Sequence, residues 1–174
     1  MNSGCSISND FIDIVGLCDW SDENLPPHSA WTEISVPETL VVPRQKPNIE
    51  QVNSVTVCAK IIRKKVIVTP VANNPCKENF EGKKLTGKKL IVEGELLQTV
   101  NYTAAVCEQS VHSAHFIVPF SAFIVVPCDK KEFEVNVCVE DVFIKAITPR
   151  EIFKNVTLLL VAMPLAVPAC PNEG

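Results

Sequence analysis

The fold is decided by residues 88–127, KKLIVEGELLQTVNYTAAVCEQSVHSAHFIVPFSAFIVVP. We interpret this stretch as two long β-strands joined by a turn near residues 108–110. In the first strand, mostly apolar residues occupy the even positions from 90 to 106 and mostly polar residues occupy the odd positions. This is the period-two pattern of a strand with one buried face. The second strand, residues 112–126, is apolar at both even and odd positions, which predicts that both of its faces are covered. Pro119 interrupts it and predicts a bulge or a bend.

Extended segments with β-branched and alternating residues continue on both sides of this pair. They are separated by proline-rich or glycine-rich turns, and residues 149–154 are expected to form one helical turn. About eight strands joined in this way predict an all-β protein with a β-sandwich fold, of which the jelly roll is one form. The other expected strands are residues 31–43, 49–69, 133–139, 142–148 and 155–167.

Three regions of different composition suggest the domain organisation. Residues 1–30 are expected to form an extended amino-terminal arm, residues 31–167 the β-sandwich domain, and residues 168–174 a short carboxy-terminal tail. The arm contains one apolar patch, residues 11–17, which we expect to add a strand to the sheet of a neighbouring subunit. The alternative is an edge strand within the same chain.

The composition excludes several classes of function. Hydrophobic residues make up 47% of the 174 residues, enough for a packed core, and the net charge of −4 argues against nucleic acid as a partner. The most apolar run, residues 158–169, is short and contains two prolines, so we expect no membrane insertion. No nucleophile motif such as G-x-S-x-G is present, and we expect no catalytic residues, no enzymatic activity and no cofactor.

The eight cysteines are the most informative candidates for function. The polar, solvent-facing sides of expected strands carry Cys58, Cys107 and Cys138. Expected turns contain Cys76 and Cys128, and the ends of the chain carry Cys5 and Cys170. A structural thiol normally sits among apolar neighbours instead. Exposed thiols at such places suit disulfide bonds between subunits. Intramolecular disulfides and inert reduced thiols are the alternatives, because eight cysteines allow many pairings. The candidates for intersubunit disulfides are Cys5, Cys18, Cys58, Cys76, Cys107, Cys128, Cys138 and Cys170.

Two histidines near the start of the second strand invite comparison with a metal site. His112 and His115 are three residues apart, and residues at that spacing on a strand point to opposite faces of the sheet. One ion would not reach both rings, so we expect no metal site here.

Several segments resemble the SPOCS domain family of spore-forming Bacillota. These are V-P-E-T-L at residues 36–40, Q-K-P-N-I-E-Q-V at residues 45–52 and V-I-V-T-P at residues 66–70. Further similar blocks lie at residues 90–96, 100–102, 111–116 and 119–120, so the resemblance extends from about Trp31 to Thr148.

This resemblance implies a β-rich interaction module of the endospore coat or exosporium. The amino terminus lacks the basic and apolar regions of a signal peptide. The resemblance implies synthesis in the mother-cell cytoplasm, where no signal peptide is needed, and a mature location at the spore surface.

Together with the exposed thiols, the resemblance predicts a structural, self-assembling subunit of a spore surface layer or fibre, in the coat, the exosporium or an appendage. We expect intersubunit disulfides and strand addition to stabilise the assembly. Its expected partners are copies of itself and other spore coat proteins. The alternative is a binding module that anchors spore coat proteins without polymerising.

Overall fold

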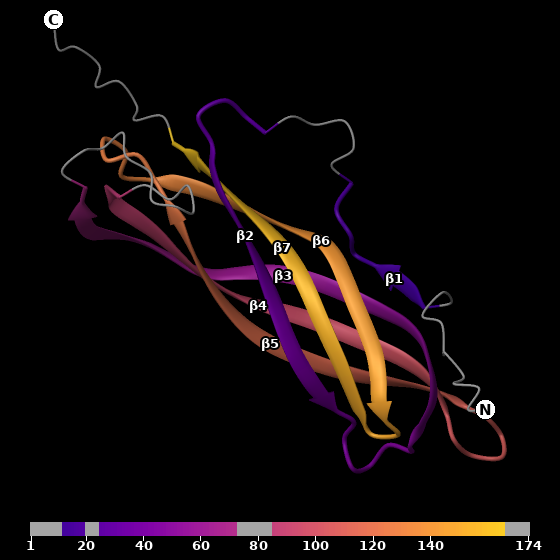
Figure 1. Cartoon of the computed structure of the whole chain (residues 1–174). Helices are drawn as coiled ribbons and strands as arrows, with labels where there is room; N and C mark the ends of the chain where they lie inside the picture. Colours follow the sequence, from indigo (N-terminus) through magenta and orange to yellow (C-terminus); the bar gives the residue numbers. More distant parts are fainter. Residues whose placement is uncertain (1–11, 20–24, 73–84, 166–174) are drawn as a thin grey trace, which may run out of the picture.

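A computed structural model describes residues 12–19, 25–72 and 85–165 of the chain. The described residues contain seven β-strands and no helix, and most of the strands are long (Figure 1). The strands are β1 (Asp13–Val15), β2 (Ala30–Val41), β3 (Ile49–Val71), β4 (Thr86–Ala104), β5 (Val111–Val125), β6 (Phe133–Thr148) and β7 (Glu151–Pro164).

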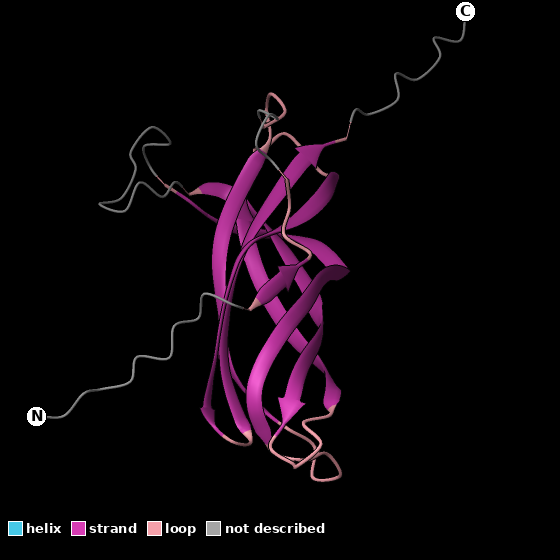
Figure 2. Cartoon of the chain, turned by 90° about the vertical axis from the view of Figure 1, so that its right-hand side faces the viewer, coloured by secondary structure: helices cyan, strands magenta, loops and turns pink. Residues whose placement is uncertain are grey.

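The strands form two sheets that pack face to face, so the predicted β-sandwich is confirmed (Figures 1 and 2). The four-stranded sheet has the order β1-β3-β4-β5, and the three-stranded sheet has the order β2-β7-β6. All neighbours are antiparallel except β1, which runs parallel to β3. A jelly roll has eight strands in two Greek keys. The simple meander of β3, β4 and β5 within one sheet is a different topology.

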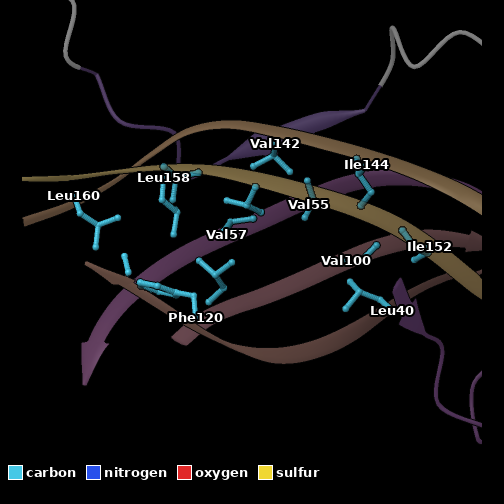
Figure 3. Close-up of a cluster of buried hydrophobic side chains, with 14 of the residues drawn as sticks. Leu40, Val55, Val57, Val100, Phe120, Val142, Ile144, Ile152, Leu158 and Leu160 are labelled. Atoms are coloured by element: carbon cyan, nitrogen blue, oxygen red, sulfur yellow. The ribbon is translucent and has the colours of Figure 1, made fainter. Parts of the chain in front are cut away.

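Apolar side chains from both sheets meet between them and form one core (Figure 3). On β4 the even positions from Leu90 to Ala104 are all buried, as the period-two pattern predicts. Their side chains are apolar or aromatic except at Gly94 and Gln98. On β7 the same alternation buries Ile152, Val156, Leu158 and Leu160. The inner faces of both sheets are therefore encoded by simple alternation along the strands.

The structure corrects the expectation that β5 is covered on both faces. Ile117 is 65% exposed and Phe123 is 43% exposed, because no described strand covers the outer face of the four-stranded sheet. The expected bulge at Pro119 is also wrong. Pro119 pairs with Glu95 in continuous register. An edge strand tolerates proline because its outer side needs no N–H donor.

Residues 133–154 also differ from the prediction. The two expected strands at 133–139 and 142–148 form the single strand β6, with a register shift between Val139 and Asp141. Residues 149–154 form no helical turn. Residues 149 and 150 form a tight turn, and β7 begins at Glu151. Ile152 and Lys154 point inward and continue the alternation of that strand.

Arg150, in the turn between β6 and β7, fixes the connection that carries the chain from one sheet to the other. This connection, residues 42–48, leaves β2 and enters β3. The planar guanidinium presents several donors in a fixed arrangement, which suits a set of backbone carbonyls. Its Nη1 donates to Lys46 O (3.1 Å) and Asn48 Oδ1 (3.0 Å), and its Nη2 donates to Val42 O (2.9 Å) and Pro43 O (2.8 Å).

We predict that Arg150→Ala lowers the free energy of unfolding by about 2–4 kcal/mol, because several charge-assisted hydrogen bonds are lost together. Arg150→Lys should recover little of this, since an ammonium lacks the planar set of donors. Urea unfolding followed by circular dichroism would measure both. Arg63→Ala is the matched control. Arg63 pairs with Glu93 at 2.7 Å on the exposed surface, and its loss should leave the unfolding midpoint unchanged. Equal midpoints for the Arg150 variants and the control would contradict this role.

Candidate functional site: the cysteines and the surfaces that carry them

Cys18 and Cys138 form a disulfide within the chain, with their Cα atoms 5.6 Å apart. Cys18 lies just after β1, and its backbone N–H donates to the carbonyl of Val139 on β6 at 2.9 Å. The disulfide thus joins the amino-terminal arm to the edge of the three-stranded sheet.

This disulfide corrects the prediction for both cysteines. Cys138 was expected on a solvent-exposed face, but it is 1% exposed. The reason is that the segment carrying Cys18 lies against this part of β6 and covers the thiol. Since Cys18 and Cys138 are bonded to each other, they are not candidates for bonds between subunits.

The arm also contributes its strand to its own chain, not to a neighbour. Asp13, Ile14 and Val15 pair with Ser54, Val55 and Thr56 of β3. Gly16 follows with a φ of +105°, and a Cβ there would collide with the carbonyl of Val57. Only glycine permits this close passage. The arm therefore contacts the four-stranded sheet through β1 (Figure 1). It contacts the three-stranded sheet through Cys18.

We predict that Cys18→Ser lowers the free energy of unfolding by about 2–4 kcal/mol, because the disulfide closes a long loop in the unfolded chain. The two cysteines are separated by 120 residues. Thermal unfolding of the variant, measured without reductant, would test this. Cys58→Ser removes an exposed thiol and serves as the control, with no change expected. A Cys18→Ser variant as stable as the control would show that the disulfide adds nothing to the fold.

Among the described residues, three further cysteines are free and exposed: Cys58, Cys107 and Cys128. Cys58 lies on β3, on the solvent face that the sequence predicted. Cys107 was expected on the polar face of a strand, but β4 ends at Ala104 and Cys107 lies in the following turn. Cys128 lies in a turn, as predicted. The candidates Cys5, Cys76 and Cys170 lie outside the described residues.

Cys58 lies in a row of side chains that crosses the outer face of the four-stranded sheet. It pairs with Leu97 on β4, and Leu97 pairs with Ile117 on β5. Leu97 is 38% exposed and Ile117 is 65% exposed. The row therefore places a free thiol beside apolar surface that is open to solvent.

Cys107 and Cys128 lie beyond opposite ends of the edge strand β5, which runs from Val111 to Val125. A strand of this length spans about 50 Å. The sandwich consequently carries an exposed thiol near each end of its long axis.

The two histidines are on opposite faces, as their spacing predicts. His112 pairs with Tyr102 and its ring stacks on that buried ring, with 5.9 Å between the centroids. The His115 Nδ1 lies 3.0 Å from the Thr99 hydroxyl on the outer face. Among the described residues, no three of the side chains that commonly ligate metals come together.

The sequence reasoning missed a polar cluster within the core, formed by Glu38, Gln98 and Lys154. Lys154 is fully buried and Gln98 is 3% exposed. The sequence contains a signal for the burial of Lys154. This residue occupies an even position, as Ile152 and Val156 do, on a strand whose even positions point inward. Burial lowers the pKa of Lys154, and the neighbouring Glu38 carboxylate partly opposes this shift.

None of the described residues forms a helix that is long and apolar enough to cross a membrane. Comparisons with curated proteins and with solved structures found no match. A family model described as "SipL, SPOCS domain" matches residues 48–147, which is more than half of the chain. The match covers four of the seven described strands, β3, β4, β5 and all of β6 except its last residue. The chain therefore belongs to the SipL SPOCS domain family, which indicates a protein related to sporulation.

Proposed function

We propose that this protein is a structural subunit that assembles with copies of itself into a layer or fibre at the spore surface, in the coat, the exosporium or an appendage. The observation that carries the proposal is the position of free thiols at both ends of the sandwich, at Cys107 and Cys128, with a third at Cys58. Disulfides between such positions join subunits end to end or side to side.

The edges of the four-stranded sheet support strand addition between subunits. β1 pairs with β3 only at residues 54–56, and beyond them β3 pairs on this side with no other described strand. β5 pairs only with β4 among the described strands. Open strand edges are sites where another chain can extend a sheet.

Contact between two different surfaces of the same subunit would produce an open assembly. A head-to-tail contact that does not close into a ring generates a filament. In such an assembly the thiols at the two ends of β5 face neighbouring copies, and an oxidising environment converts the contact into a covalent bond.

The role is structural and not enzymatic in this proposal. Mature subunits would lie at the spore surface after synthesis in the mother cell, and other spore coat proteins would be additional partners. The exposed row of Leu97 and Ile117 supports one alternative, a module that anchors such proteins without polymerising.

We predict that the purified full chain, boiled in detergent without reductant, gives a ladder of oligomers on electrophoresis. Reductant should collapse the ladder to monomer. The triple variant Cys58→Ser, Cys107→Ser, Cys128→Ser should lose most of the ladder, because it lacks the free thiols of the described surface. Electron microscopy of the unreduced sample would then distinguish a sheet from a fibre.

The variant Cys18→Ser, Cys138→Ser is the matched control, since it removes two thiols that are bonded within the chain. Its ladder should match that of the unaltered protein. A monomer in both lanes would overturn the crosslinked subunit and favour the anchoring module. A full ladder in the triple variant would overturn the assignment to these three thiols.

A further inference from the structure

The polar cluster in the core brings together an amine, a carboxylate and an amide from three strands. Lys154 lies on β7, Glu38 on β2 and Gln98 on β4, so the cluster spans both sheets. The Lys154 Nζ is 2.8 Å from Glu38 Oε1, and the Gln98 Nε2 donates to the same oxygen at 3.0 Å. Both nitrogens therefore meet at one carboxylate oxygen.

We propose that Lys154 and Gln98 become joined by an isopeptide bond inside the folded domain, with Glu38 as the group that transfers the protons. The bond would be an amide between Nζ of Lys154 and Cδ of Gln98. It is a covalent modification of the subunit itself and does not depend on assembly.

The surroundings favour the reactive form of the amine. The Lys154 Nζ is in ion-pair contact with the Glu38 carboxylate, but the two groups are not aligned as in a hydrogen bond. Nζ therefore has no hydrogen-bond partner among the described residues. Charged groups are unstable in an apolar interior. Transfer of one proton from the ammonium to the carboxylate removes both charges, and leaves a neutral amine as nucleophile beside a neutral carboxylic acid.

The same transfer activates the amide. The Gln98 Oε1 is buried and has no hydrogen-bond partner among the described residues. The two ends of a glutamine amide are nearly identical in shape, so a half-turn of the group exchanges Oε1 and Nε2. The protonated Glu38 then donates to Oε1, satisfies this orphaned acceptor and polarises the carbonyl, which is general acid catalysis.

The reaction balances without an oxidant or a reductant. The lone pair of Nζ attacks Cδ and forms the new C–N bond. The carbon Cδ is then tetrahedral, and rotation about the Cγ–Cδ bond returns Nε2 to Glu38. Nζ gives up a proton to Glu38, Glu38 passes a proton to Nε2, the bond from Cδ to Nε2 breaks, and Nε2 leaves as ammonia. The fold holds amine and amide together, and such positioning replaces a slow bimolecular encounter by an intramolecular step.

The test is the intact mass of the purified, folded full chain after reduction of its disulfides. We expect a mass lower than that of the sequence by one molecule of ammonia. Proteolysis should give one branched peptide that joins the segments around residues 98 and 154, and trypsin should no longer cleave after Lys154. The full sequence mass in the folded protein would overturn the proposal. Loss of water with a link between Lys154 and Glu38 would overturn it too.

Variants assign the roles of the three side chains. Glu38→Gln should abolish the branched peptide because no group remains to transfer the protons, and Lys154→Met should abolish it because the nucleophile is gone. Glu93→Gln, at the exposed pair with Arg63, is the matched control and should retain it. Circular dichroism would confirm that each variant is folded. A branched peptide that persists in folded Glu38→Gln would overturn the role of Glu38.

Discussion

Burial of apolar side chains between the two sheets is the interaction on which the rest of this structure depends. Alternating apolar side chains along β2 to β7 form the inner faces of both sheets. Exposing such an apolar face to water is unfavourable, so each sheet is stable only when the other covers it. The two sheets differ in width, and the connections between them must pass around the core. Arg150 holds one of these connections at an end of the sandwich, and the disulfide of Cys18 holds the arm along its side.

The fold class could be predicted because period-two alternation is a local property of each strand. The sequence could not show which outer faces are open, since this depends on what covers each sheet in the fold. For that reason β5 was expected to be covered on both faces, although Ile117 lies on an outer face that no described strand covers. Cys138 was assigned to solvent for the same reason, because the segment that covers it lies far away in the sequence.

The segments that resemble the SPOCS family have physical roles in the structure. Glu38 of the V-P-E segment provides the carboxylate of the core cluster. In the Q-K-P-N segment, the carbonyl of Lys46 accepts from Arg150, and the carbonyl of Pro47 accepts from the Tyr102 hydroxyl at 3.1 Å. These residues thus hold the crossing between the sheets, whereas the free thiols lie on the outer face and in exposed turns.

The position of the disulfide has a mechanical consequence. It encloses the sequence from Cys18 to Cys138, which includes β2, β3, β4 and β5. If the protein is pulled by its two termini, the load passes from Cys18 directly to Cys138 through the covalent bond. With the disulfide as the only cross-link, the chain before Cys18 and the chain after Cys138 can be drawn out, and the backbone of β3, β4 and β5 carries no tension. A subunit built in this way would stretch by a limited length and stop.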